Sequence, residues 1–190
     1  NFKRNGAVVG ISGGIDSSVC LALSVKAFGA EKVLGIIMPE KDSSPDSEEL
    51  ALELAARFGI RTVKEVITDA LTGFRCYERR DEAVKRVFPE YDPKTWKMKI
   101  GVRQSGLYNN LPPLFTLTVI DSDGNQKDKI LHAPEYLQIV AASNFKQRSR
   151  MSILYYHAEA LHYAVIGTPN KHEQEQGFFV KYGDGGADVM

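Results

Sequence analysis

The residues Ala7-Val8-Val9-Gly10-Ile11-Ser12-Gly13-Gly14-Ile15-Asp16-Ser17-Ser18 join an apolar run to a turn rich in glycine and serine. The run over 7–11 is short and contains β-branched residues, which predicts a buried strand. The apolar residues over 19–25, with Ala and Lys among and after them, are interpreted as a helix. This stretch therefore predicts a strand, a tight turn and a helix in immediate succession.

The strand-to-helix pattern recurs further along the chain. The elements that it predicts are a strand over 33–38 ended by Pro39, a helix over 50–58 capped by Asp46 and Ser47 and stopped at Gly59, and a strand over 61–67. Strands that alternate with helices of this length pair in parallel through right-handed crossovers. The predicted fold class is α/β, a parallel sheet with helices on both faces, whose ligands bind beyond the carboxyl ends of the strands.

The middle of the chain is less regular, because prolines and glycines interrupt it. A helix is predicted over 81–87, followed by loops or short pieces up to 113. The segment Asp121-Ser122-Asp123-Gly124-Asn125, between the β-prone runs 114–120 and 129–132, predicts a β-hairpin. The remaining elements that the pattern predicts are helices over 134–142 and 147–162, with a break near Ser143 and Asn144, a strand over 163–166, and a glycine-rich functional loop over 177–190.

Length and composition favour one globular domain. The chain has 190 residues, of which 43% are hydrophobic and 25% charged, enough for one core. Because 24 basic residues balance 24 acidic ones, no overall field would draw the chain to nucleic acid or to an anionic membrane. Cys20 and Cys76 form neither a disulfide framework nor a zinc-binding spacing, and no apolar stretch reaches membrane-spanning length. A soluble, cytoplasmic protein is expected.

The turn over 12–18 is the strongest functional feature of the sequence. Gly13 and Gly14 let the backbone approach a ligand, and amide groups at a helix N-terminus point at anions with the helix dipole behind them. The hydroxyls of Ser12, Ser17 and Ser18 add donors. The turn lacks the Gly-Lys-Ser/Thr of a Walker A loop, so it would hold phosphate differently. The alternative is a plain strand-to-helix turn that Asp16 and Ser17 cap.

Two further motifs accompany the turn Ser12-Gly13-Gly14-Ile15-Asp16-Ser17. They are Asn144-Phe145-Lys146-Gln147-Arg148-Ser149-Arg150-Met151 and the pair of segments Gly167-Thr168-Pro169-Asn170-Lys171-His172-Glu173 and Lys181-Tyr182-Gly183-Asp184-Gly185-Gly186-Ala187-Asp188. The turn is similar to the phosphate loop of the ATP-pyrophosphatase superfamily, and the three motifs together resemble those of the NAD synthetase family within it. The resemblance also covers 38–55, and it implies a Rossmann-like fold of the adenine nucleotide alpha hydrolase type.

The resemblance implies an ATP-dependent, ammonia-consuming amidation of deamido-NAD through an adenylated carboxylate, with release of AMP and pyrophosphate. It assigns ATP binding to Ser12, Gly13, Gly14, Ser17, Ser18, Met38 and Thr168; Mg²⁺ binding and catalysis to Asp16 and Glu173; catalysis to Lys181; and substrate binding to Asn144, Arg148, Lys181 and Asp184. Hard carboxylate oxygens suit Mg²⁺. Read singly, the arginines and glutamates would be solvated surface charge; their joint occurrence favours the site.

The resemblance also implies a homodimer, for which Leu154, Tyr155, Tyr156 and Tyr163 are expected to offer an aromatic surface. The tract 75–142 lies outside the resemblance and is interpreted as an atypical insertion, carrying the hairpin, within one ATP-pyrophosphatase domain over 1–190 that is truncated at its C-terminus. Ammonia would come from solution or from a glutaminase domain or subunit. Two alternatives stay open, namely a related ligase for another carboxylate and a non-catalytic nucleotide-binding module.

Overall fold

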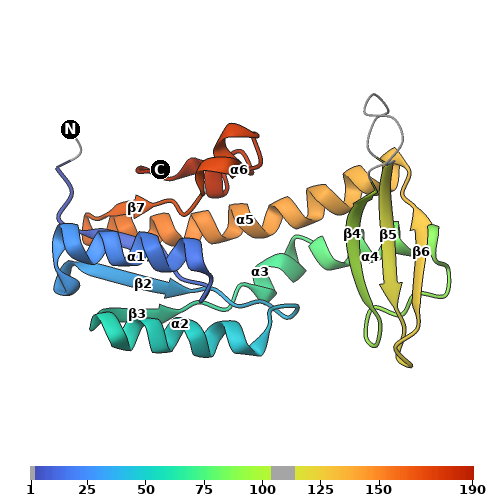
Figure 1. The fold of residues 1–190 in the computed structure, drawn as a ribbon, viewed down its shortest axis with the longest axis horizontal. Helices are drawn as coiled ribbons and strands as arrows, with labels where there is room; N and C mark the ends of the chain where they lie inside the picture. Colours follow the sequence, from blue (N-terminus) through green and yellow to red (C-terminus); the bar gives the residue numbers. More distant parts are fainter. Residues whose placement is uncertain (1–2, 104–113) are drawn as a thin grey trace. The chain divides into compact units, whose positions relative to one another are not determined.

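The computed structural model describes residues 3–103 and 114–190 and contains two units, each with its own core (Figure 1). The first unit comprises Asn1–Gly73 and Asn144–Met190, and the second comprises Phe74–Ser143. One helix, α5 (Ala133–Leu161), contributes residues to both units. Within the described residues, no helix has the length and apolarity that crossing a membrane requires.

The first unit is built on a four-stranded parallel sheet with the order β3-β2-β1-β7. Its strands are β1 (Ala7–Gly10), β2 (Val33–Ile37), β3 (Arg61–Lys64) and β7 (Ala164–Ile166). Every residue of β2 is buried, as are the first three of β1, because helices cover both faces of the sheet. The sequence prediction of a parallel α/β sheet is confirmed.

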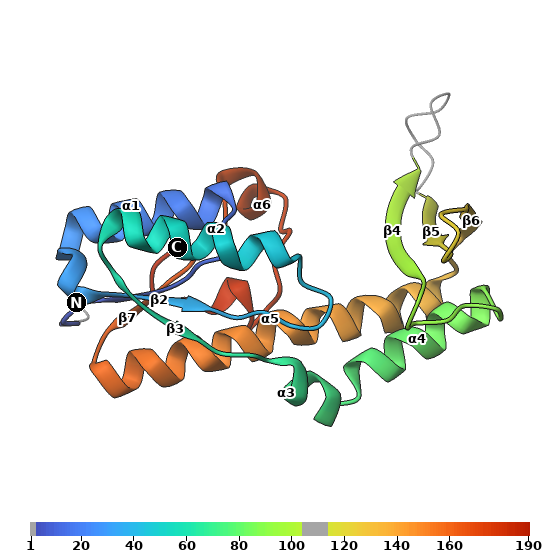
Figure 2. The same ribbon diagram turned by 90° about the horizontal axis from the view of Figure 1, so that it is seen from below.

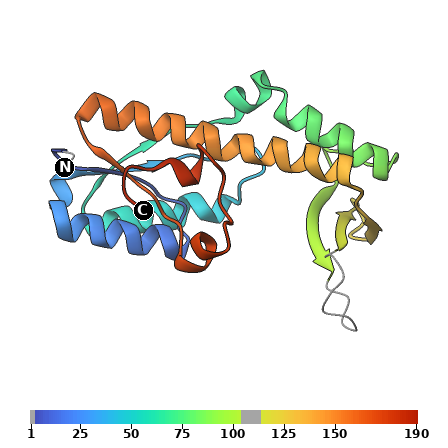
Figure 3. The same ribbon diagram turned by 90° about the horizontal axis from the view of Figure 1, so that it is seen from above.

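The helices of the first unit lie on opposite faces of this sheet (Figures 2 and 3). One face carries α1 (Ile15–Phe28) and α2 (Pro45–Phe58), and the other carries the part of α5 that belongs to this unit. Val9 packs in the core with Leu21 of α1 and Ala55 of α2. A Cβ on Gly10 would lie 3.6 Å from the side chain of Leu154, which places α5 against the opposite face.

Short elements complete the first unit. They are the 3-10 helices η1 (Ala30–Lys32) and η2 (Asp184–Gly186), and the helices α3 (Thr68–Gly73) and α6 (Lys171–Glu175). Val189 forms a parallel bridge with Ile166, so the segment after η2 lies along the free edge of β7. The glycine-rich end of the chain is thereby fixed to the sheet.

The predicted caps of α2 are wrong. Asp46 and Ser47 lie inside the helix, and its N-cap position is Ser44, with Pro45 as the first helical residue. Proline suits that position because its missing amide hydrogen would have no partner in the first turn. The C-terminal prediction is confirmed, since α2 ends at Phe58 and Gly59 takes the left-handed conformation, with φ 64°.

The second unit is a three-stranded antiparallel sheet beside α4 (Cys76–Val87) and the first part of α5. Its strands, in the order β4-β5-β6, are β4 (Lys97–Arg103), β5 (Leu114–Ile120) and β6 (Gln126–Ile130). The core includes Val84 and Phe88 at the end of α4, and Leu117 and Val119 of β5. The β5–β6 pairing confirms the predicted hairpin, and Gly124 takes a φ of 84° in its turn.

Two predictions in this region are wrong. The tract before 103 was expected to be loops or short pieces, yet β4 is a seven-residue strand that pairs with β5 along its whole length. Its Lys97-Met98-Lys99-Ile100 alternates polar and apolar residues as a half-buried strand does, a pattern that the surrounding prolines obscure. The predicted break near Ser143 and Asn144 is absent, because α5 continues for 29 residues. Ser and Asn weaken a helix only slightly, and packing of buried residues such as Ala142 and Met151 outweighs that cost.

The residues expected to form an aromatic surface near the end of α5 are largely buried within the first unit. Leu154 is 7% exposed, Tyr155 and Tyr163 are half-buried, and of the four expected residues Tyr156 alone is largely exposed, at 66%. The hydroxyl of Tyr155 makes hydrogen bonds inside the unit, with Gly186 and Asp188. These side chains therefore do not form a continuous aromatic patch.

Candidate active site

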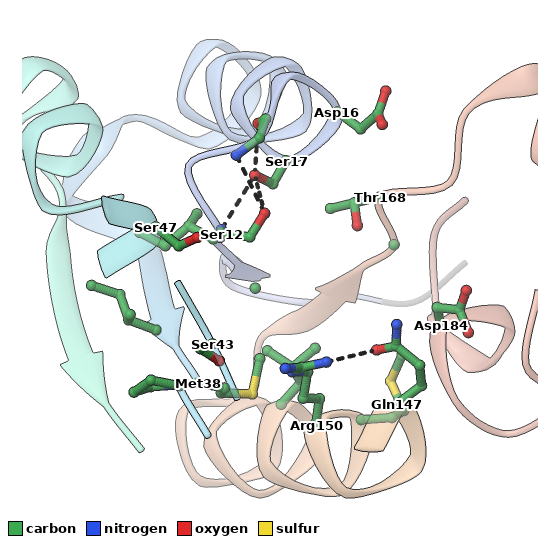
Figure 4. A pocket seen from close by; sticks show the side chains of 18 of the residues that line it. Ser12, Asp16, Ser17, Met38, Ser43, Ser47, Gln147, Arg150, Thr168 and Asp184 are labelled. Atoms are coloured by element: carbon green, nitrogen blue, oxygen red, sulfur yellow. Dashed lines mark hydrogen bonds between the residues drawn. The ribbon is translucent and has the colours of Figure 1, made fainter. Parts of the chain in front are cut away.

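The glycine-serine turn links the carboxyl end of β1 to the first turn of α1 (Figure 4). The hydroxyls of Ser17 and Ser18 donate hydrogen bonds to the carbonyl of Gly14 at 3.0 and 2.8 Å. The amide of Ser12 donates to Ser17 Oγ at 3.3 Å, and the amide of Gly14 donates to Ser12 Oγ at 3.3 Å. The serines thus stabilise the shape of the turn, which presents the amide end of α1.

The two glycines of the turn have different roles. Gly13 takes a φ of 77°, and a Cβ there would lie 2.7 Å from Leu50 Cβ and 3.1 Å from the carbonyl oxygen of Ser47, both on α2. Gly14 has an ordinary extended backbone, and a Cβ there would meet only Ser12 Oγ, at 3.4 Å. Gly13 is therefore required for the close approach of the turn to α2, whereas Gly14 leaves open space toward a ligand.

Alanine substitutions should separate these roles. Gly13→Ala is expected to destabilise the fold by about 2 kcal/mol or more, because it combines positive φ with a steric clash. That loss corresponds to a melting temperature lower by roughly 4–8 °C. Gly14→Ala should leave the melting temperature nearly unchanged and weaken nucleotide binding. Thermal unfolding and nucleotide titration of both variants test this, and equal melting temperatures would contradict the assignment.

A pocket of about 620 Å³ opens at the carboxyl ends of the parallel strands, a size typical of small-molecule sites. It contains eight of the residues that the sequence analysis assigned to the site: Ser12, Gly14, Asp16, Ser17, Met38, Thr168, Glu173 and Asp184. Five assigned residues do not line it: Gly13, Ser18, Asn144, Arg148 and Lys181. Gly13 and Ser18 instead line a smaller cavity of about 170 Å³ between α1 and α2.

Several pocket residues were not predicted from the sequence. They are Glu40, Ser43, Ser44, Ser47 and Glu48 from the β2–α2 loop and the start of α2, and Gln147, Arg150, Met151 and Leu154 from α5. In Figure 4, Ser12 and Ser17 lie on one wall, and Gln147 and Arg150 lie on the helix opposite. Positions 147, 150, 151 and 154 share one face of a helix, so helical spacing could have predicted from the sequence that these four residues lie together.

Carboxylates dominate the charge of the pocket. Asp16, Glu40, Glu48, Glu173 and Asp184 line it, against the guanidinium of Arg150. Two of these carboxylates form ion pairs, Glu40 with Lys146 at 2.7 Å and Glu48 with Lys64 at 2.6 Å. Among the described residues, no group of three or more His, Cys, Asp or Glu side chains forms a metal cluster. Lysines outside the pocket thus pair with two of the five carboxylates, and the lining remains acidic because Asp16, Glu173 and Asp184 outnumber Arg150.

Glu173 holds one end of the pocket through a capping box. Its amide donates to Asn170 Oδ1 at 3.0 Å, and its own Oε2 accepts from the amide of Asn170 at 3.0 Å. This reciprocal pair fixes the start of α6 and orients the carboxylate. A carboxylate accepts several hydrogen bonds or metal contacts, so the carboxylate of Glu173 can bind a further group while it keeps the capping box.

The two arginines of α5 face different surroundings. Arg148 Nε donates to the carbonyl of Lys181 at 3.2 Å, so Arg148 supports the segment before η2 and does not line the pocket. Lys181 is exposed, with its Nζ 4.9 Å from the ring centroid of Tyr182. Arg150 lines the pocket, and its Nη1 donates to Gln147 Oε1 at 3.4 Å.

The C-terminal wall of the pocket is held by hydrogen bonds of two aspartates and a tyrosine. Asp184 Oδ1 accepts from the amide of Val180 at 2.9 Å, and Asp188 Oδ2 accepts from the amide of Val165 at 2.9 Å. The hydroxyl of Tyr155 lies 2.8 Å from the carbonyl oxygen of Gly186 and 3.0 Å from Asp188 Oδ1. Burial, followed by the hydrogen bond and the negative charge of Asp188, raises the pKa of Tyr155 to about 12.

Tyr155 should therefore link the stability of this wall to alkaline pH. The pKa of Tyr155 in the folded state lies above its unfolded value of about 10. The stability that its protonated hydroxyl contributes is therefore complete below pH ~10 and is lost as the pH rises through about 12. We expect one phenol to ionise about two pH units later than an ordinary tyrosine, and Tyr155→Phe to remove that late step. Phenolate absorbance across the alkaline range measures this. A late phenol that persists in the variant would contradict it.

These features define a class of protein. A parallel sheet whose first turn presents amides at the amino end of a helix, with a polar pocket at the carboxyl ends of its strands, is a nucleotide-binding α/β arrangement. The sequence model of the NAD synthase family matches residues 1–91 and 116–190. The chain belongs to the NAD synthase family.

Individual relatives agree with this family. The chain is 50% identical over 189 residues to an ammonia-dependent NAD+ synthetase of Mesorhizobium japonicum, covering 100% of this chain and 59% of the relative. It is 36% identical over 190 residues to that of Thermotoga maritima, covering 99% of this chain and 61% of the relative. The chain thus spans about three-fifths of the length of these relatives.

Solved structures give the same fold. An ammonia-dependent NAD synthetase of Campylobacter jejuni, in complex with nitrate, superposes with a TM-score of 0.62 at 25% identity, over 100% of this chain and 58% of that one. An NMN synthetase of Francisella tularensis superposes with a TM-score of 0.62 at 26% identity, over 100% of this chain and 56% of that one.

Proposed function

We propose that this chain is the ATP-binding part of an NAD synthetase, a ligase that forms a carbon–nitrogen bond by amidating deamido-NAD with ammonia. The observation that carries the proposal is the pocket, which unites the serine-glycine turn, Asp16, Thr168 and Glu173 at the carboxyl ends of the sheet. The 50% identity to an ammonia-dependent NAD+ synthetase supports the choice of reaction. The same residues suit adenylyl transfer, which needs positioned anions and donors more than a nucleophilic side chain.

The reaction would proceed in two displacements. A carboxylate oxygen of deamido-NAD attacks the α-phosphorus of ATP, the bond to the bridging oxygen of the β-phosphate breaks, and pyrophosphate leaves. Ammonia then attacks the acyl carbon, loses a proton to solvent and expels AMP. In this scheme the turn over 12–18 and the amide end of α1 hold the leaving pyrophosphate. Thr168 and Met38 contact the remainder of the nucleotide from β7 and β2.

Asp16 and Glu173 would hold Mg²⁺ together with phosphate oxygens of ATP. The donor set fits, because Mg²⁺ in phosphate sites is usually bound by one or two carboxylates, with substrate phosphates and water completing the shell. The surplus of carboxylates in the pocket also fits, since a triphosphate would otherwise meet like charge. When bound, the ion neutralises charge that develops on the phosphates. The two side chains position it from α1 and α6.

The acceptor would be oriented by the second group of assigned residues. We propose that Asn144, Arg148, Lys181 and Asp184 contact deamido-NAD, and that Lys181 balances developing negative charge. The contact from Arg148 Nε to the Lys181 carbonyl, 3.2 Å, supports their acting together, and Asp184 brings this group to the pocket. Arg150 extends the group, because its guanidinium lines the pocket opposite the turn.

A related amidation is the second candidate. The structural likeness to an NMN synthetase, at 26% identity, favours a nicotinate mononucleotide acceptor as an alternative. The test is pyrophosphate release by the full-length protein with ATP, Mg²⁺ and ammonia, with deamido-NAD, nicotinate mononucleotide or other carboxylates as acceptors. Activity with deamido-NAD supports the first proposal, and activity with the mononucleotide alone supports the second. Binding of ATP without release of pyrophosphate in the presence of any acceptor would favour a non-catalytic module.

The nitrogen source and the compartment follow from the same proposal. Free ammonia is the proposed donor, since the relatives from Mesorhizobium japonicum and Thermotoga maritima are named as ammonia-dependent. Activity with glutamine but not with ammonium would instead indicate a glutaminase domain or subunit. We propose a cytoplasmic location, where the thiols of Cys20 and Cys76 would stay reduced.

We further propose that residues 75–142 are an insertion within one ATP-pyrophosphatase domain. The separate core of the unit Phe74–Ser143 supports this, as does the gap that the family model leaves over 92–115.

A homodimer is also proposed. Its support is an apolar stripe on α1, where Ile15, Val19 and Leu23 are 76%, 49% and 60% exposed at helical spacing. Light scattering at micromolar concentration measures the mass, and the mass of one chain would refute the dimer.

A further inference from the structure

Lys146 ties the β2–α2 loop to helix α5 at the edge of the pocket. Its Nζ lies 2.7 Å from Glu40 Oε1 and 3.2 Å from Asp42 Oδ2. The side chain of Glu40 is 5% exposed and that of Lys146 is 20% exposed, whereas that of Asp42 is 38% exposed. The contact with Glu40 is therefore the more desolvated one, and removing the ammonium would take a positive charge away from a buried carboxylate.

The loop that receives Lys146 is a tight turn centred on Glu40. Glu40 Oε2 accepts from the amide of Asp42 at 3.0 Å, and the amide of Glu40 donates to Ser43 Oγ at 3.0 Å. The amide of Ser43 donates in return to the carbonyl of Glu40 at 2.9 Å. Because these bonds hold the turn together, the position of Glu40 determines where the whole turn lies.

The contact joins two walls of the pocket. On one side the turn continues into Ser43, Ser44 and Ser47, which line the pocket together with Met38 before it. On the other side Lys146 immediately precedes Gln147 and lies one helical turn before Arg150, and both of these line the pocket from α5. Lys146 does not line the pocket itself, so its effect on a ligand passes through Glu40 and the two walls.

We propose that Lys146 is a positioning residue for nucleotide binding, which fixes the separation of the β2–α2 loop from α5 and thereby the width of the ATP pocket. This inference rests on the proposed function. A positioning role differs from a purely stabilising role, because a misplaced wall weakens the binding of the ligand that lies between the walls. Removing a stabilising ion pair lowers the melting temperature without that selective effect.

The test compares ATP binding and steady-state kinetics in the full-length protein. Lys146→Met is expected to weaken ATP binding and raise the KM for ATP by about tenfold or more, with kcat changed by less than about threefold, because walls that contact the nucleotide equally in the ground state and the transition state contribute uniform binding. Lys146→Arg should restore ATP affinity to within about threefold, because a guanidinium can contact both carboxylates. The KM for the carboxylate acceptor should change little in either variant.

Lys64→Met is the matched control. Lys64 pairs at 2.6 Å with Glu48, which also lines the pocket, but this pair joins α2 to the neighbouring β3 and does not reach α5. Loss of Lys64 should therefore leave ATP affinity near the wild-type value. An equal loss of affinity in Lys64→Met and Lys146→Met would overturn the positioning role, and so would unchanged ATP affinity in a folded Lys146→Met protein.

A second variant covers the case in which Lys146→Met does not fold. Glu40→Gln keeps the shape of the side chain and removes the charge that attracts Lys146, and we expect it to lower ATP affinity about threefold or more. Unchanged affinity would then count against the proposal. Failure of the wild-type protein to bind ATP would overturn the proposed function as well. Normal wild-type activity with unaffected variants would overturn the positioning role alone.

Discussion

Asp16→Asn and Glu173→Gln are each expected to lower the rate of pyrophosphate release by about 100-fold or more. Each removes one carboxylate from the pair proposed to hold Mg²⁺ against the ATP phosphates, and a metal ion contributes several kcal/mol of charge stabilisation to such a reaction. The measurement is pyrophosphate release at saturating acceptor over a range of Mg²⁺ concentrations. Partial recovery at high Mg²⁺ would identify weakened metal binding as the cause.

Both substitutions should leave the fold intact. Asp16 is exposed on the first turn of α1, and glutamine at 173 can keep the capping box with Asn170. The matched controls are Asp46→Asn, in the first turn of α2, and Glu175→Gln, on α6 two residues from Glu173; neither residue lines the pocket. Wild-type turnover by Asp16→Asn or Glu173→Gln would remove that residue from the metal site.

Elements with a strong local pattern could be predicted from the sequence. The strand, turn and helix over 7–28 follow from an apolar run, two glycines and a helical apolar pattern within one short stretch. The hairpin at Gly124 follows in the same way from a turn that needs positive φ. In these places local propensity and tertiary structure agree, and reading residue by residue suffices.

Local patterns do not reveal what a distant contact decides. Ser143 and Asn144 suggest a helix end by local preference, but burial of their neighbours on α5 keeps the helix continuous. The sequence shows that Gly13 lies in the turn, but not that a Cβ there would meet Leu50 on α2, 37 positions later in the chain. Such effects depend on which helices pack together, which is not encoded in a local pattern.

The surroundings of two arginines also depend on how α5 packs. Arg148 and Arg150 lie two positions apart, so on a helix they point in different directions. The sequence motif contains both, and the resemblance assigned the substrate contact to Arg148. In the structure Arg150 lines the pocket, whereas Arg148 supports the Lys181 carbonyl. Which of the two arginines lines the pocket depends on which face of α5 packs toward the sheet.

Arg150→Met is accordingly expected to lower kcat/KM for ATP by roughly 10- to 100-fold. A guanidinium in the pocket can make charge-assisted hydrogen bonds to a nucleotide, each contributing about 1.5–3 kcal/mol. Arg150→Lys should recover only part of the loss, because an ammonium cannot reproduce the planar donor pattern. Gln147, which accepts from Arg150 Nη1 at 3.4 Å, would help to hold the side chain toward the pocket.

Arg148→Met provides the comparison, since the two residues share a helix and a charge. Loss of the contact to the Lys181 carbonyl, 3.2 Å in the structure, should loosen the segment that leads to Asp184 and raise the KM for the carboxylate acceptor more than the KM for ATP. Steady-state titrations of each substrate at saturation of the other measure both effects. If Arg148→Met raised the KM for ATP and Arg150→Met left it unchanged, the guanidinium acting on the nucleotide would be that of Arg148, and the pocket wall formed by α5 would have to turn in the nucleotide-bound enzyme.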